Sequence, residues 1–470
     1  MDLSKIKYYP DKFYLCLDGF DLAHLISFDS DESFSQQQSI YIHEYYHYLT
    51  NITTFQGIRQ FNIHFQDRIR LLSILLSKVG IDAFPLINNE NSLCENELKY
   101  WNDVKLLIDS EDLNYDLAKV TDETPSKSFK VSSISDFSEK MEVVVNGETY
   151  LGDRFLKRIE IDGIPSISSF KLTIGVIDEF LSASIDEFLF EHNMADNLEV
   201  LKLRPFYPYR LFDEILLHFN LYGMSNLSKI LVSYFALHSF NPVVCFIEVL
   251  TSIQTNGLAT FEKEPIKYLT QLLKGDEIDI YISSSKYIEE FANECCCQKR
   301  KNLAGLMYLM KSKTDICTML MKEDYFYFLK PFLIKDVDSK NGRKEFLRLF
   351  KDIRNKFEEP LILQNKTFVN ADKTRFKNHL AMALAIYEIL QSIEKNRIAK
   401  RSDYFKNKYS FPIGDDNSDK LENMKGQFPI YDTWQLALNE LSLYGVYLGI
   451  KKYQSCTVQN CRCDKGFNPT

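Results

Sequence analysis

Two histidines and a glutamate stand within five consecutive positions of this chain: His43, Glu44 and His47. Residues four apart lie one above the other on an α-helix, so both imidazole rings can point at a single cation. Apolar residues continue at helical spacing on either side, and several serines before them offer helix starts. We therefore predict a helix over residues 35–56 that carries a metal site on one face.

Glu44 is one residue from His43 and is therefore set to one side of the histidine pair. From there its carboxylate can hold a water molecule on the metal and remove a proton from it without being a ligand. In a second interpretation both histidines are core residues of a buried helix and Glu44 is solvated. A buried helix rarely carries a Glu between two His without a partner, which favours the metal site if a third ligand exists.

At these three residues the chain resembles the zincins, a superfamily of zinc metallopeptidases. The resemblance implies that His43 and His47 bind one catalytic zinc ion and that Glu44 is the general base in peptide-bond hydrolysis. Zincins with a third histidine shortly after the motif are disfavoured, because Thr50 and Thr53 occupy those positions here. The resemblance is thus to the zincins whose third ligand is a glutamate from a later helix.

Residues 173–192 are acidic yet apolar at helical spacing, which predicts a second amphipathic helix. By the resemblance, Glu179 matches the third metal ligand best. Asp186 would orient a ligand histidine by accepting the hydrogen of its other ring nitrogen. Glu187, with Glu191 four residues later, is the reserve assignment. The other interpretation of each carboxylate is a solvated acidic helix face.

The predicted fold class is α+β and predominantly helical. We expect a zincin-like part over residues 1–200, a larger all-helical part over 201–452, and a cysteine-containing tail over 453–470. Residues 130–165 contain strand patterns, including a hairpin around Asn146-Gly147. Zincins keep a small sheet beside the active-site helix, and only about thirty residues precede the motif here. We therefore expect the 130–165 strands to complete that sheet.

Hydrolysis of a peptide bond builds negative charge on the carbonyl oxygen, which a nearby hydrogen-bond donor stabilises. The candidate donors are Tyr207, Tyr209, Arg210 and His238, with His218 as a further one. Nothing in the sequence selects between them.

Net charge and hydropathy exclude several classes of partner. A formal net charge of −9 argues against a nucleic-acid binder, which would carry a basic face. The N-terminus has no apolar segment typical of a secretory signal, and residues 231–250 contain His, Asn, Pro and Glu, which disfavours a membrane span. We expect a cytoplasmic location, a protein or peptide substrate, and a regulatory protein partner.

The cysteines suggest one more site. The chain has 10 of them, and three consecutive ones at 295–297 do not suit a disulfide framework. Cys456, Cys461 and Cys463 lie within eight residues and would form most of a second zinc site, although no fourth ligand is evident nearby.

Two functions fit these patterns. The first is a zinc-dependent metallopeptidase with a water molecule in the open fourth position of the metal. The alternative is a non-catalytic, zincin-like protein-binding module with a structural metal site.

Overall fold

The computed structural model describes residues 6–9, 14–17, 25–28, 33–62, 129–145, 148–162, 169–196, 204–273, 301–364 and 367–368, with residues 198, 201, 286, 288–290 and 293 between them. Within these ranges the chain is mainly helical and carries two small sheets, which confirms the predicted class. Residues 453–470, with the three tail cysteines, lie outside the described residues, as do long stretches of 201–452.

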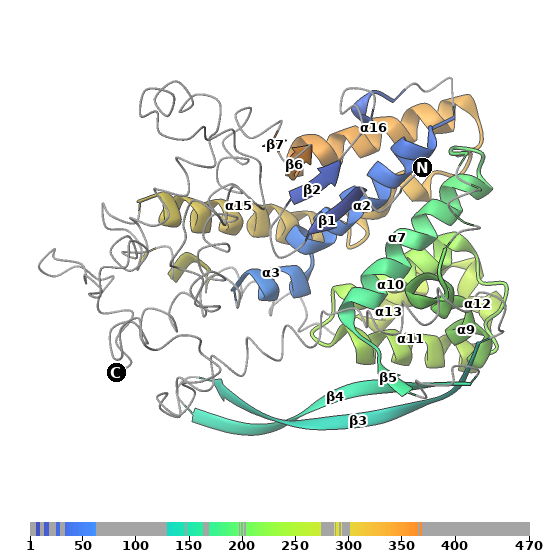
Figure 1. Cartoon of the computed structure of the whole chain (residues 1–470), viewed down its shortest axis with the longest axis vertical. Coiled ribbons are helices and arrows are strands. Elements are labelled where there is room, and N and C mark those ends of the chain that lie inside the picture. Colours follow the sequence, from blue (N-terminus) through green and yellow to red (C-terminus); the bar gives the residue numbers. More distant parts are fainter. Residues whose placement is uncertain are drawn as a thin grey trace, which may run out of the picture.

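The first sheet joins the beginning of the chain to a segment about 350 residues later. Its strands are β1 (Ile6–Tyr9), β2 (Tyr14–Leu17), β6 (Leu361–Gln364) and β7 (Thr367–Phe368), in that order. β1 pairs antiparallel with β2, and β2 pairs parallel with β6. Among the described strands β1 is therefore at an edge. It lies against α2 (Gln36–Thr53), the helix that carries the two histidines (Figure 1).

The strands predicted over 130–165 are present but belong to a separate sheet. β3 (Lys130–Val145) and β4 (Glu148–Asp162) form the predicted hairpin, with Val145 paired to Glu148, and β5 (Ser169–Lys171) adds to β4. Figure 1 shows them as a long ribbon below α9 and α11. The prediction that they complete the sheet beside α2 is wrong. The buried apolar run of β6 takes that place, and β6 and β7 interrupt the part expected to be all-helical.

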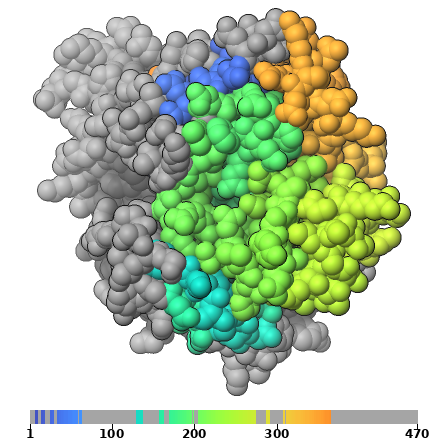
Figure 2. Space-filling model, turned by 90° about the vertical axis from the view of Figure 1, so that its right-hand side faces the viewer, coloured from blue at the N-terminus to red at the C-terminus, as the bar shows by residue number. Residues whose placement is uncertain are grey.

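The helical elements after the ribbon begin with the predicted acidic helix. They are α7 (Ile174–Glu191), η6, a π-helical turn (Phe206–Arg210), α9 (Leu211–His218), α10 (Asn226–Leu237), α11 (Pro242–Asn256), α12 (Leu258–Lys263), α13 (Pro265–Leu272), α15 (Lys301–Glu323), the 3-10 segment η8 (Tyr327–Leu333) and α16 (Lys340–Phe357). Figure 2 shows the green segments from α7 to α13 at the centre of one face, with α16 in orange beside them. No helix in the described part of the chain is both long enough and apolar enough to cross a membrane.

Helix α2 is buried along nearly its whole length, and this explains its unusual content of tyrosine. A tyrosine can fill a core if its hydroxyl finds an acceptor. Three hydroxyls of α2 do so by donating to backbone carbonyls of the later part: Tyr45 to Glu358 (2.8 Å), Tyr46 to Phe328 (3.0 Å) and Tyr48 to Phe357 (2.9 Å). The helix is thereby bonded to Phe328, Phe357 and Glu358.

The ends of α2 have identifiable causes. Ser35 begins the helix with a capping box, in which its hydroxyl accepts from the backbone of Gln38 while the Gln38 side chain accepts from the Ser35 backbone. The helix ends at Thr53, earlier than predicted, because Thr54 adopts an extended conformation and its hydroxyl bonds to the carbonyl of Thr50. The chain then continues as α3 (Phe55–Phe61).

Gly57 permits the close approach of α3 to α2. A Cβ atom at this position would lie 2.0 Å from the carbonyl oxygen of Asn51, which is far inside van der Waals contact. The glycine therefore sets the angle at which the chain leaves the histidine helix.

Candidate metal centre

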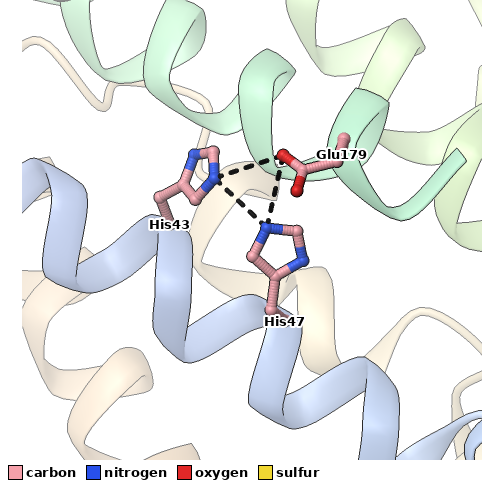
Figure 3. A group of neighbouring side chains, drawn as sticks. All are labelled: His43, His47 and Glu179. Atoms are coloured by element: carbon pink, nitrogen blue, oxygen red, sulfur yellow. Dashed lines mark hydrogen bonds and ion pairs between the residues drawn. The ribbon is translucent and has the colours of Figure 1, made fainter. Parts of the chain in front are cut away.

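Helices α2 and α7 bring the predicted ligands together. His43 and His47 project from one face of α2, and Glu179 reaches them from α7 (Figure 3). The two Nε2 atoms are 3.2 Å apart, and Oε2 of Glu179 lies 3.8 Å from that of His43 and 3.7 Å from that of His47. Ligands about 2.0–2.2 Å from a tetrahedral zinc ion would be roughly 3.4 Å apart. The three atoms therefore have the spacing of a site for one small cation.

Two aspartates of α7 hold the imidazole rings from behind. His43 Nδ1 is 2.8 Å from Oδ2 of Asp186, and His47 Nδ1 is 2.6 Å from Oδ2 of Asp178. A carboxylate accepts a hydrogen from each ring, so we assign both histidines as the Nδ1–H tautomer. The lone pair of each Nε2 then faces Glu179. Asp186 thus occupies the place expected for an orienting carboxylate.

The convergence of these atoms concentrates negative potential in one buried space. Oε2 of Glu179 is buried and has no hydrogen-bond partner among the described residues. Two nitrogen lone pairs and a carboxylate oxygen in one buried space repel each other unless a proton or a cation lies between them. The residues therefore fit a divalent metal ion, and the donor set of two His and one Glu is typical of zinc.

The charges of the centre shift the pKa values of its groups when no metal is present. Burial opposes the charged ring of His47, but the carboxylates of Asp178 and Glu179 outweigh burial and raise its pKa well above the ordinary value. Burial would raise the pKa of Glu179, yet the neighbouring His47 and His43 lower it to about 2. A proton on His47 therefore competes with a cation for the same position.

Glu44 lies beside the centre and is held by the edge strand. Its Oε2 accepts the backbone N–H of Tyr8 on β1 at 2.6 Å. Burial raises the pKa of Glu44 above the ordinary value, while the nearby rings of His43 and His47 oppose that effect. The carboxylate is next to the ligand set without belonging to the three converging atoms, which is the position expected of a general base.

Of the candidate donors, Tyr209 is the one that the structure places near the histidines. Its ring centroid is 6.4 Å from that of His43, and the charge of Glu179, together with burial, raises its pKa well above the ordinary value. Tyr207 is buried against Phe170, at 5.7 Å between ring centroids. Arg210 is exposed.

His238 and His218 lie elsewhere. The His238 ring packs on Tyr234 and Tyr325 at the end of α10, with centroid distances of 4.4 and 5.6 Å. His218 is exposed in the last turn of α9, beside Phe219. The described contacts place neither ring against the ligands.

The reserve carboxylates are engaged with other partners. Glu187 accepts from Lys229 at 3.1 Å and lies 3.6 Å from Arg204, and Glu191 accepts from the side chain of Asn226 at 2.8 Å. Neither belongs to the group of ligand atoms, so the reserve assignment of Glu187 is wrong. The reason is the direction of the helix face, because Glu187 is turned toward α10 rather than toward α2.

Two residues of the centre received no role from the sequence. Asp178 orients His47 and also accepts the hydroxyl hydrogen of Thr50 at 2.7 Å. Arg204 pairs with Asp186 through its guanidinium. Asp178 and Asp186 are two helical turns apart and thus share a face, a signal that could have indicated Asp178. No comparable pattern marks Arg204.

Comparisons of the chain with models of protein families, with curated proteins and with solved structures give no match.

Proposed function

We propose that this chain is a zinc-dependent metallopeptidase that hydrolyses peptide bonds with Glu44 as general base. The observation that carries the proposal is the convergence of His43, His47 and the unpartnered carboxylate oxygen of Glu179, with each ring held in the metal-binding tautomer. A zinc ion bound there would supply Lewis acidity toward a water molecule and a substrate carbonyl.

The residues of the chain account for the proton transfers. Glu44 accepts a proton from the attacking water and passes it to the leaving amine, and a pKa raised by burial brings its carboxylate closer to the range in which a general base works best. Tyr209, whose hydroxyl keeps its proton because its pKa is raised, donates a hydrogen bond to the oxygen that becomes negative.

The edge strand supports an extended peptide as substrate. The Tyr8 N–H points at Glu44 and hence away from β2. Alternate residues of an antiparallel strand point their N–H and C=O to the same side, so the backbone of Ile6 also faces away from β2. The Tyr8 N–H is bonded to Glu44, so a peptide would pair with the outward backbone of Ile6 and thereby lie next to the general base. We place this activity in the cytoplasm and expect a regulatory protein partner.

The test compares the wild-type chain with Glu44→Gln. Glutamine keeps a side-chain oxygen that can accept from the Tyr8 N–H, so the variant should fold and bind zinc like the wild type, but it cannot take a proton. We expect wild-type chain loaded with zinc to cleave a mixed peptide library and the variant to do so about 100- to 10,000-fold more slowly. Metal content is measured by emission spectroscopy and cleavage by mass spectrometry.

The outcomes separate the two functions. Equal cleavage by both chains contradicts the role of Glu44. One equivalent of bound zinc without cleavage by the wild type supports the alternative of a protein-binding module with a structural metal. A chain that binds no metal contradicts both.

A further inference from the structure

Arg204 is a buried cation behind the metal centre. Its side chain is 7% exposed, and it comes from the loop that precedes η6. One guanidinium nitrogen, Nη2, donates to Oδ2 of Asp186, and the other, Nη1, donates to the carbonyl oxygen of Ala183 at 3.1 Å. The guanidinium fork therefore joins a side chain of α7 to the backbone of the same helix.

Asp186 receives more donors than an orienting carboxylate needs. Besides Arg204, it accepts from His43 Nδ1 at 2.8 Å and from the hydroxyl of Ser39 at 3.2 Å. Its side chain is only 3% exposed. Three donors fix the orientation of the Asp186 carboxylate. Because His43 Nδ1 donates to this carboxylate, the orientation of the His43 ring is fixed as well.

The partner of the other histidine is held differently. Asp178 accepts from His47 and from the hydroxyl of Thr50, its side chain is 24% exposed, and no Lys or Arg pairs with it among the described residues. The aspartates that orient the two histidines therefore differ in burial and in the charges around them. Asp186, which orients His43, is buried and paired with a cation, whereas Asp178, which orients His47, is partly exposed.

The guanidinium is itself restrained. Its Cζ lies 5.3 Å from the centroid of the Tyr209 ring, which covers one face of it. A planar cation that forks onto two acceptors and stacks on a ring cannot be replaced by a lysine, because an ammonium group is a point charge on a flexible stem. Stability alone does not explain such an arrangement, since a buried ion pair is often no more stabilising than an apolar pair of similar volume.

We infer that Arg204 is a positioning residue for the metal ligand His43: it fixes Asp186 by its fork and thereby fixes the His43 ring, without touching metal or substrate. The inference rests on the proposed function, because it concerns the same metal.

The test measures zinc affinity and the geometry of the centre in Arg204→Met and Arg204→Lys. Zinc affinity is obtained by competition with a chromophoric chelator, and the geometry is reported by the visible absorption spectrum of the cobalt-substituted chain. The matched control is Lys229→Met, which removes another largely buried cation next to α7. Lys229 pairs with Glu187 and Asp213. Glu187 also lies 3.6 Å from Nη1 of Arg204, so this control removes a neighbouring cation and leaves the fork of Arg204 on Asp186 in place.

We expect Arg204→Met to bind zinc about 10- to 100-fold more weakly and to show an altered cobalt spectrum. Arg204→Lys keeps the charge but not the fork, so its zinc affinity should lie between those of wild type and Arg204→Met, again with an altered spectrum. Lys229→Met should match the wild type in both measurements.

Wild-type zinc affinity and an unchanged cobalt spectrum in Arg204→Met would overturn the inference, as would equal weakening by Lys229→Met. If Arg204→Met does not fold, the cobalt spectrum of Arg204→Lys decides, and an unchanged spectrum there also overturns it. A wild-type chain that binds no zinc contradicts the proposed function instead, so the two failures are distinct.

Discussion

At the scale of single residues, side chains of the same type have different contacts and therefore different roles. Within nine positions of α7, Glu179 points its oxygen at two ring nitrogens, while Asp178 and Asp186 hold the far sides of those rings. The histidines divide in the same way. His43 and His47 face a carboxylate cluster, whereas His238 has tyrosine rings around it and no hydrogen-bond partner for either nitrogen among the described residues.

The isolation of His238 leads to a prediction about pH. Burial lowers the pKa of this ring to about 3, whereas the ordinary value is about 6.5. At pH 7.5 and above the ring is largely neutral in both the folded and the unfolded chain and has little effect. As the pH falls from 6.5 toward 3, the His238 ring binds a proton in the unfolded chain but stays neutral in the folded chain. The free energy of unfolding therefore falls. We expect His238→Phe to remove about 1 kcal/mol of this loss at pH 5.5, measured by urea unfolding at pH 7.5 and 5.5.

The control for this prediction is His218→Phe, because His218 is exposed on α9. That variant should keep the wild-type dependence of stability on pH. A His238→Phe chain whose stability falls between pH 7.5 and 5.5 as much as that of the wild type would show that the ring can be protonated in the folded state.

The sequence indicates a metal site at this scale but does not assign every residue. The spacing of His43 and His47 is a property of one helix and can be seen in the sequence. The choice of Glu179 over Glu187 depends on which side of α7 faces α2, and that is decided by the packing of two helices distant in sequence. Arg204 could not be found, because its partner Asp186 is eighteen residues away and in another element.

At the scale of elements, the important neighbour of the histidine helix is the short strand β1. Tyr8 ties it to α2 twice, by its backbone N–H to Glu44 and by its hydroxyl, which accepts from Asn51 at 2.8 Å. Strand β1 and the carboxylate of Glu44 are thus held in a fixed relation. If peptides pair with this edge, a change of one outward backbone N–H should affect substrate binding more than turnover.

Ile6→Pro removes such an N–H. The ladder between β1 and β2 should survive, because the N–H of residue 6 faces away from β2 and proline is tolerated on edge strands. One lost hydrogen bond costs about 0.5–1.5 kcal/mol, so we expect the KM for a cleaved peptide to rise about 2- to 10-fold with little change in kcat. Ile6→Ala, which keeps the N–H, is the control. Equal KM values for the two variants would argue that substrate does not use this edge.

The first sheet shows that local sequence patterns do not predict where a strand lies in the fold. The strands over 130–162 are recognisable from their residues, as is the hairpin that joins them. Their place in the fold is not, since pairing of β2 with β6 brings together residues about 350 positions apart. A run of four residues such as Leu361–Gln364 gives too short a pattern to indicate a strand, and its pairing with β2 is invisible in the sequence.

At the scale of the whole molecule, the core around α2 is built from both ends of the described chain. The aromatic rings of Tyr45 and Tyr46 pack on Phe350 of α16, with centroid distances of 5.4 and 6.3 Å, and Phe28 contacts the same ring at 5.9 Å. His43 and His47, on the same helix, face α7. The helix that positions the histidines therefore depends on residues about 300 positions later.

This dependence predicts a long-range effect of Phe350→Ala. Phe350 is 1% exposed, and removing its ring should lower the free energy of unfolding by about 3–5 kcal/mol. If residues 36–53 and 340–357 share one core, hydrogen exchange of the α2 amides should accelerate together with that of α16. Tyr222→Ala is the control, because Tyr222 is 72% exposed and its loss should change neither stability nor exchange. Faster exchange in α16 with unchanged protection of α2 would mean that the two helices unfold separately, and the histidine helix would then owe its position to α7 and β1 alone.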